Sequence, residues 1–129
     1  MNRDFIPIQS LQGELKISHK LRNLGLTVST EEIVIQKPHV NYHILLDHIV
    51  SIVPYESEIR DYRYVNRRHN NEEITRREAG LNMFKVYVTT STMHNRSGIF
   101  SLRQMDFILP IHKEILAAIG RYSELKVIQ

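Results

Sequence analysis

Apolar and polar residues alternate over much of the first half of the chain. From Leu15 to Tyr55 the apolar residues recur with a period of two, the spacing that places one face of a β-strand in a core. Short polar stretches that favour turns divide this region into five predicted strands, at 15–17, 24–28, 33–35, 40–46 and 49–53. Pro54 is expected to end the fifth strand, because proline cannot donate to a ladder.

The alternation resumes in the second half of the chain. Phe84, Val86 and Val88 alternate with Lys85 and Tyr87 in "NMFKVYVTTSTMH", which predicts a sixth strand. The following "HNRSG" is dense in turn formers, so "GIFSLRQ" is expected to return as the second arm of a hairpin. The sequence therefore predicts seven strands.

The period changes near the C-terminus. Pro110 suits the first turn of a helix, where a missing N–H is tolerated, and we expect the helix to begin there. Apolar residues then follow at three-four spacing, which predicts one buried stripe: Ile111, Ile115, Ala118, Ile119, Tyr122 and Leu125. The opposite face is charged and should be solvated: Lys113, Glu114, Arg121, Glu124 and Lys126.

These elements predict one domain over residues 1–129, with a short N-terminal tail at 1–12 and an arginine-rich insertion at 56–81. Its class is mainly β with one helix (α+β). We expect a seven-stranded antiparallel barrel or sandwich with the C-terminal helix across one end, since a helix can close the apolar mouth of such a sheet.

The order of these segments resembles the pleckstrin-homology superfold, and more narrowly its small bacterial members and the related GRAM-type domains. The stretches that carry the resemblance are "LKISHKLR", "STEEIVI" and "ILLDHIVSIV", followed by the hairpin and the terminal helix. The chain departs from the family pattern at His48, where an acidic residue usually precedes the isoleucine, and in its arginine-rich insertion. The resemblance implies the fold and a binding role, not a particular ligand.

Composition excludes several classes of protein. No apolar run approaches the roughly 18 residues of a membrane span, and "MNRDFIPIQSLQGELK" does not resemble a secretory signal. The chain has no cysteine, so thiol chemistry is excluded and a cytoplasmic location is expected. A net charge of +3 allows an anionic partner, including peripheral contact with a membrane surface, without requiring one.

Three basic residues form a candidate phosphate site. Lys16, Lys20 and Arg22 resemble the basic arrangement that some phosphoinositide-binding members of the superfold place on their first two strands. Cations projecting from a tight turn can surround a phosphate. Ordinary surface charge on a strand turn explains the same spacing.

The insertion contains a second candidate contact surface, for another protein, a nucleic acid or another anion. Arginines interleaved with tyrosines can hold phosphates and stack on bases, and the residues concerned are Arg60, Tyr62, Arg63, Tyr64, Arg67, Arg68, Arg76 and Arg77. Four acids share the segment, so six arginines leave a net charge of only +2 between 60 and 78. This balance is typical of a solvated loop, and the charge order of "NNEEITRREAG" also suits a short solvated helix.

Histidine patterns predict neither a metal site nor an enzyme, and we expect no cofactor. His39 and His43 in one strand would lie about 13 Å apart, too far to share an ion, and nearby His48 does not change this. Asp47 and His48 are adjacent, so in a strand they would face opposite sides. His19 and His112 are each solitary in the sequence and are expected at the surface or at a helix cap.

We therefore expect a non-enzymatic binding or scaffolding module that acts through protein-protein contacts. The expected surfaces are the exposed sheet edge, the groove beside the helix and the arginine-rich loop, with a backbone edge able to bind an extended partner strand. Self-association through the same surfaces, as a homodimer, is a further expectation. The alternatives are peripheral binding to anionic lipid headgroups and nucleic-acid binding by the basic loop.

Overall fold

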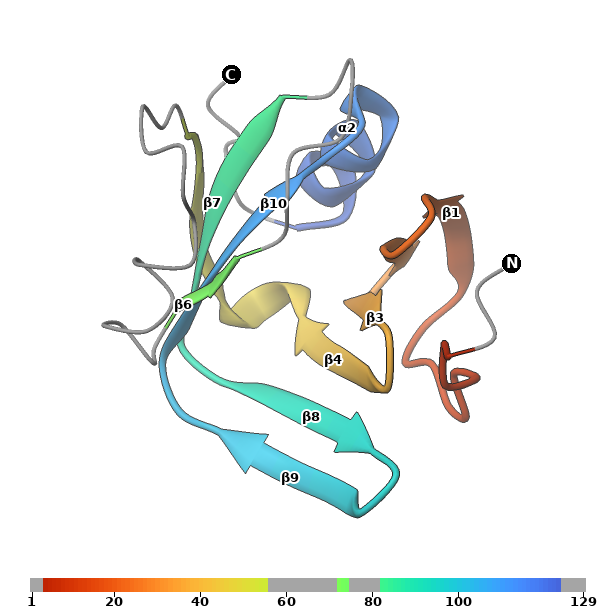
Figure 1. Cartoon of the computed structure of the whole chain (residues 1–129). Coiled ribbons are helices and arrows are strands. Elements are labelled where there is room, and N and C mark those ends of the chain that lie inside the picture. The colour runs from red at the N-terminus through yellow and green to blue at the C-terminus, as the bar shows by residue number, and fades with distance from the viewer. Residues whose placement is uncertain (1–3, 56–71, 75–81, 124–129) are drawn as a thin grey trace.

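Two β-sheets and one C-terminal helix make up the part of the chain that the computed structural model describes, residues 4–55, 72–74 and 82–123 (Figure 1). The strands before the arginine-rich segment are β1 (Leu15–Lys20), β2 (Gly25–Ser29), β3 (Glu32–Lys37), β4 (Val40–Leu45) and β5 (Ile49–Pro54), with a short 3₁₀ helix η1 (Leu46–His48) before β5. The later elements are β6 (Glu72–Ile74), β7 (Met83–Val88), β8 (Ser91–Asn95), β9 (Gly98–Leu102), β10 (Met105–Pro110) and helix α2 (Lys113–Tyr122).

The first sheet is an antiparallel meander completed by a later hairpin. Its six strands lie in the order β1-β2-β3-β4-β8-β9. The period-two pattern sets which side chains face inward: Leu26 opposes Ile35, and Ile35 opposes Tyr42, all on the core face. The predicted strands of the first half are therefore confirmed, and Pro54 does end β5.

The second sheet has four strands in the order β5-β7-β10-β6. β5, β7 and β10 are antiparallel neighbours, whereas β6 pairs with β10 in parallel. β10 is buried over its last four residues, Phe107 to Pro110, which is the continuous apolar pattern of a strand covered on both faces.

One long bent hairpin joins the two sheets. Its first arm runs through β7 in the second sheet and β8 in the first, and its second arm returns through β9 and β10 (Figure 1). Both arms bend at the same point along the hairpin. Val88 opposes Met105 at the end of the second sheet, and Ser91 opposes Leu102 at the start of the hairpin's part in the first sheet. This bend places the sheets face to face around a shared core.

The core lies between the sheets and is closed at one end by α2. Phe107 from the second sheet meets Tyr42 from the first edge to face, with ring centroids 5.1 Å apart. Helix α2 buries Ile115, Leu116 and Ile119 at the end of the sandwich, where it lies beside β1 and β2. Its solvated face is confirmed at Lys113, Glu114 and Arg121, while 124–129 lie outside the described residues.

The architecture corrects several predictions from the sequence. The sandwich alternative is confirmed in general form and the barrel is wrong, because the strands divide into two sheets with no closed ring. In the described part of the chain ten strands replace the predicted seven: the bend splits the first arm of the hairpin into β7 and β8, Glu72–Ile74 form β6, and "MDFILP" is a strand that periodicity did not reveal. A short, continuously apolar run does not distinguish a strand from a buried helix.

Pro110 does not begin the helix. It is the last residue of β10, opposite Met83, where a residue without an N–H fits a strand end. Ile111 still belongs to the core but precedes the helix, and its N–H donates to Asn82 O in the loop before β7. The helix starts at Lys113 after His112, whose Nδ1 accepts the N–H of Glu114 as an N-cap.

The short helix considered for "NNEEITRREAG" is wrong over Glu72–Ile74, which form strand β6. The backbone of this short strand pairs with Asp106, Phe107 and Ile108 of β10. Backbone hydrogen bonds to the edge of β10 stabilise a strand here more than the order of acidic and basic residues stabilises a helix.

Candidate functional site

The face of the six-stranded sheet that points away from the core is polar, yet much of it is buried. On β2, β3 and β4 the buried polar residues of this outer face are Thr27, Ser29, Glu32, Gln36 and Asn41. Residues 4–14 cover them without forming a strand: side chains of the sheet bond to the backbone of the segment, and backbone N–H groups of His39 and Thr30 donate to the carbonyls of Asp4 and Glu14. The carbonyl of Ile6 accepts the side-chain amides of both Gln36 and Asn41, each at 2.9 Å, and Ile6 itself is buried.

The turn between β2 and β3 brings this N-terminal segment to the start of β3. The hydroxyl of Ser29 accepts the backbone N–H groups of Glu31 and Glu32, which orders the turn, and donates to the carbonyl of Gln12. Gly13 has a φ of +81° beside this turn, where a side chain would meet Thr30 and Glu31. Ser29 and Gly13 thereby place Gln12 directly over Glu32.

Glu32 and His43 form a hydrogen-bonded pair across two neighbouring strands. Glu32 opposes Leu45 in the register of β3 and β4, so His43 is its diagonal neighbour on the same face and lies within reach of a long side chain. Nδ1 of His43 lies 2.8 Å from Oε1 of Glu32, and Oε2 accepts the N–H of Gln12 at 3.0 Å. The Glu32 side chain is only 4% exposed and that of His43 19%.

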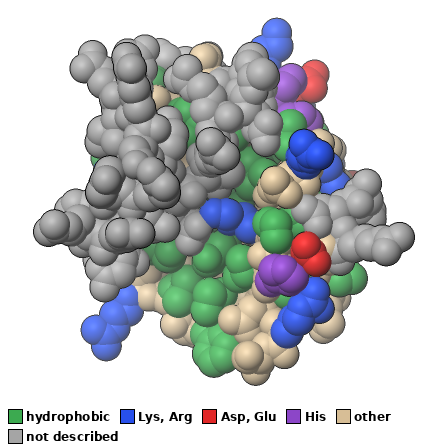
Figure 2. Space-filling view, in the orientation of Figure 1, with side chains coloured by type: hydrophobic (Ala, Val, Ile, Leu, Met, Phe, Trp, Pro, Cys, Tyr) green, Lys and Arg blue, Asp and Glu red, His purple; other side chains and the backbone are tan. Residues whose placement is uncertain are grey.

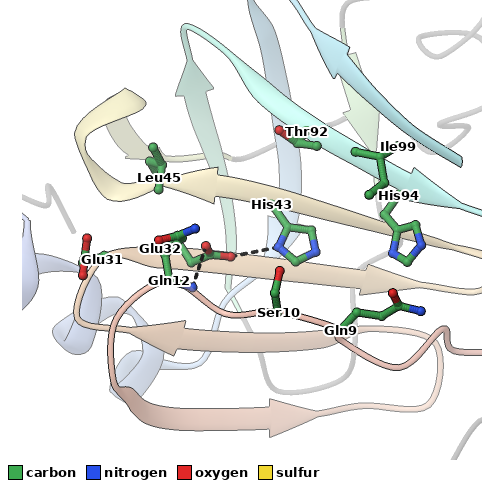
Figure 3. A pocket seen from close by; sticks show the side chains of 10 residues that line it. All are labelled: Gln9, Ser10, Gln12, Glu31, Glu32, His43, Leu45, Thr92, His94 and Ile99. Carbon is green, nitrogen blue, oxygen red and sulfur yellow. Dashed lines mark hydrogen bonds and ion pairs between the residues drawn. The ribbon is translucent and has the colours of Figure 1, made fainter.

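A cavity of about 730 Å³ opens above this pair, as Figure 3 shows. Its floor follows the outer face from Glu32 and His43 to β8 and β9, because His43 opposes Thr92 and His94 opposes Ile99. The N-terminal segment forms the opposite wall (Figure 3). The lining residues are Gln9, Ser10, Gln12, Glu31, Glu32, His43, Leu45, Thr92, His94 and Ile99.

Strand β9 forms one edge of the same sheet and carries exposed apolar side chains. In the described part of the chain only β8 pairs with it. Ile99 is 68% exposed and Phe100 43% exposed. Figure 2 shows apolar side chains gathered in the lower part of the molecule, where Figure 1 has the β8–β9 hairpin.

The outer strands β1 and β5 carry features that discourage strand addition. β1 has Lys16 and Lys20 and a bulge at its beginning, and β5 has a bulge and ends in Pro54. β9 has the sequence "GIFSL", with no charge and no proline, and it pairs with β8 in unbroken register. It is thus the least protected of these three edges.

The three basic residues of the candidate phosphate site have different surroundings. The ammonium group of Lys16 lies 3.4 Å from Glu14 and over the ring of Tyr122 in α2. Lys20 instead donates to Gln36 on the outer face at 3.1 Å and lies over Phe5. Arg22 is exposed in the turn between β1 and β2. The contacts of Lys16 and Lys20 do not bring them to a common point.

The arginine-rich surface cannot be placed in the same way, because Arg60, Tyr62, Arg63, Tyr64, Arg67, Arg68, Arg76 and Arg77 all lie outside the described residues. The binding predictions that depend on them, for a protein, an anionic lipid or a nucleic acid, stay predictions.

The other histidines occupy positions that differ from the expected strand geometry. His39 lies in the turn between β3 and β4 with a φ of 70°. Asp47 and His48 belong to η1 rather than to a strand, so the alternating-face argument does not apply to them. His112 is at a helix cap as expected, and its ring lies 5.0 Å from that of His19, so the two are neighbours in space. No cluster of three or more metal-ligating side chains occurs among the described residues.

The sequence alone does not indicate the pair of Glu32 and His43. Spacing along the chain relates His43 only to His39 and His48, its neighbours in sequence. The available signal was the alternation of polar and apolar residues: His43 takes a polar position within the predicted strand 40–46, and Glu32 continues the same alternation one residue before the predicted strand 33–35. Only the register of the two strands makes them diagonal neighbours.

Within the ranges that the structure describes, no helix is both long enough and apolar enough to span a membrane. Comparisons with protein-family models, with curated proteins and with solved structures found no match to this chain.

Proposed function

We propose that this domain is a non-enzymatic binding module that takes an extended segment of another protein as an added strand along β9. The observation that supports this proposal is the uncharged edge of β9 with Ile99 and Phe100 exposed on it. An open edge offers unpaired backbone donors and acceptors, and alternate side chains of an added strand contact the two faces beside it.

The absence of charge on β9 also suits a second copy of the chain as the added strand. In a two-fold symmetric antiparallel pair each residue opposes its own counterpart or a close neighbour. Lys16 and Lys20 on β1 would bring like charges together in such a pair, whereas "GIFSL" would not. Self-association through β9 is therefore part of the proposal.

The pleckstrin-homology-like assignment belongs to the same proposal. Two packed sheets with a single helix after the last strand agree with it, and domains of this superfold commonly act by binding. The cytoplasmic location expected from the lack of cysteine is proposed with it.

The test is capture of partners from the native cell by the intact protein and by Ser101→Lys. Ser101 is exposed on β9 and is not itself a lining residue of the cavity, although it opposes Thr92, which is; the substitution adds a charge to the edge and keeps every lining residue. Ser97→Lys is the matched control, because it adds the same charge to the turn of the same hairpin. We expect Ser101→Lys alone to lose the partner, with binding weakened about tenfold or more, equivalent to about 1.4 kcal/mol.

Equal recovery of the same partners by all three proteins would refute strand addition at β9. Size-exclusion chromatography with light scattering then separates the two kinds of partner. A dimer that Ser101→Lys dissociates identifies a second copy, whereas a monomer leaves a different protein as the ligand. Changing Arg63, Arg67, Arg68, Arg76 and Arg77 to serine tests the arginine-rich segment independently of β9.

A further inference from the structure

The cavity above Glu32 and His43 has the chemistry of a small-ligand site. Its volume of about 730 Å³ falls within the range of roughly 300–1,000 Å³ typical of small-molecule pockets. Its lining contains two carboxylates, two histidines, two side-chain amides and two hydroxyls, but no lysine or arginine among the described residues. Hydrogen-bond acceptors and negative charge therefore dominate the surface that a ligand would meet.

The buried carboxylate is difficult to explain by stability alone. Removing a carboxylate from water is costly, and an apolar pair of similar volume often stabilises a fold as well as a buried ion pair does. Glu32 nevertheless lies almost fully buried at the floor of an open cavity, with both oxygens held in place, by His43 and by the N–H of Gln12. A fixed carboxylate in a cleft is a common feature of binding sites.

The hydrogen bond to Glu32 also sets the role of His43. Because a carboxylate only accepts, Nδ1 of His43 carries the hydrogen in their contact. In the neutral ring Nε2 is then an acceptor, and it is the ring nitrogen left for a ligand in the cavity. Nε2 of His43 and the carboxylate of Glu31, at the turn before β3, are both acceptors that line the cavity. They favour a ligand with several N–H donors.

Two apolar side chains complete the site. Leu45 on β4 and Ile99 on β9 both line the cavity and are exposed. Exposed aliphatic groups beside fixed acceptors suit a ligand with a hydrocarbon chain and a cationic end, since the chain can lie on the aliphatic surface while the cation meets the acceptors. A planar guanidinium, with five donors, matches such a set more fully than an ammonium group does.

We propose that this cavity binds an organic cation, a guanidinium or ammonium group on a short hydrocarbon chain. The same chemistry is available from a free small molecule and from a basic side chain of a protein partner. An anionic ligand would oppose the charge of Glu31 and Glu32. The proposal rests on the cavity and its side chains and does not depend on strand addition at β9.

The test is a titration of the intact, ¹⁵N-labelled protein with N-butylguanidinium, followed by two-dimensional NMR. We expect saturable shifts of the backbone amides of Gln12, Glu32, His43, Thr92 and His94. N-butylurea has nearly the same shape without the charge, and we expect at least tenfold weaker binding from it. Absence of saturable shifts with the cation at millimolar concentration, or equal binding of the urea, would overturn the proposal.

Variants then assign the effect to the carboxylates. Glu31→Gln combined with Glu32→Gln keeps one acceptor oxygen and nearly the size of each side chain while it removes both charges, and we expect binding to weaken tenfold or more. Glu114→Gln, on the exposed face of α2, is the matched control and should bind as the unmodified protein does. Unchanged binding by the double variant, with a spectrum that shows an intact fold, contradicts the proposed site.

The peptide acetyl-Gly-Arg-Gly-amide distinguishes the two sources of the cation. If it binds more tightly than N-butylguanidinium at the same amides, the site takes a basic side chain of a partner. If it binds more weakly while N-butylguanidinium saturates the site, the ligand is a free small cation. Because cation binding is measured on the protein without the Ser101→Lys substitution, a loss of partner capture in that variant and a failure of cation binding are separate results.

Discussion

Nδ1 of His43 lies 2.8 Å from Oε1 of Glu32, on the outer face of the six-stranded sheet. The two residues are eleven positions apart in the chain and belong to adjacent strands. Gln12 of the N-terminal segment donates its backbone N–H to the second oxygen of the same carboxylate. One side chain thus connects β3, β4 and the segment that covers them.

The Glu32–His43 pair should contribute measurably to stability. Glu32→Ala leaves the Nδ1–H of His43 and the backbone N–H of Gln12, both in partly buried hydrogen bonds, without their acceptor, so we expect the free energy of unfolding to fall by about 3 kcal/mol. Urea denaturation measures the change. Glu32→Gln, which retains an acceptor oxygen, should lose less than half as much.

A double-mutant cycle with His43→Ala isolates the interaction itself. The coupling between the two substitutions should be about 1 kcal/mol or more, because the side chains are in direct contact. Additive effects within about 0.3 kcal/mol would show that the pair contributes nothing beyond its separate members.

The contact between Phe107 and Tyr42 connects the two sheets through the core. Phe107 is fully buried, so Phe107→Ala should lower the free energy of unfolding by about 3–5 kcal/mol through lost burial and the cavity it leaves. Phe100→Ala is the matched control on the exposed edge and should cost less than about 1 kcal/mol. Similar losses in thermal or urea unfolding would contradict the assigned core.

Gly13 is required by the backbone at the point where the N-terminal segment meets the turn after β2. An alanine there would need a φ near +81°, and its Cβ would lie 2.5 Å from Thr30 Oγ1 and 2.9 Å from Glu31 N. We expect Gly13→Ala to destabilise the protein by about 1–2 kcal/mol. Hydrogen exchange at the Gln12 amide should also accelerate, and unchanged exchange would show that the segment does not depend on this turn.

The N-terminal segment should behave as part of the folded domain rather than as a dispensable tail. Ile6 is buried, so Ile6→Ala should cost about 2–3 kcal/mol. Removal of residues 1–12 should cost more, because it also takes away the carbonyl that accepts from Gln36 and Asn41. A truncated protein with the urea midpoint of the intact one would contradict this role.

Local pattern was sufficient for most of the strands. The period of two places Leu26, Ile35 and Tyr42 on one face, and the structure has them in the core. Pattern was not sufficient where two effects compete. Pro110 suits a helix start and a strand end equally well, and its pairing opposite Met83 determines which occurs. The bend that divides the long hairpin between two sheets likewise has no periodic signal.

By itself the sequence determined a mainly β domain with a C-terminal amphipathic helix, because side-chain alternation and three-four spacing are local properties of the chain. Only the tertiary structure decided what lies on the polar face of the sheet. Strand register made Glu32 and His43 neighbours, and hydrogen bonds to Ile6 and Gln12 brought the N-terminal segment over them. Contacts between residues distant in sequence depend on register and closure, which no local spacing encodes.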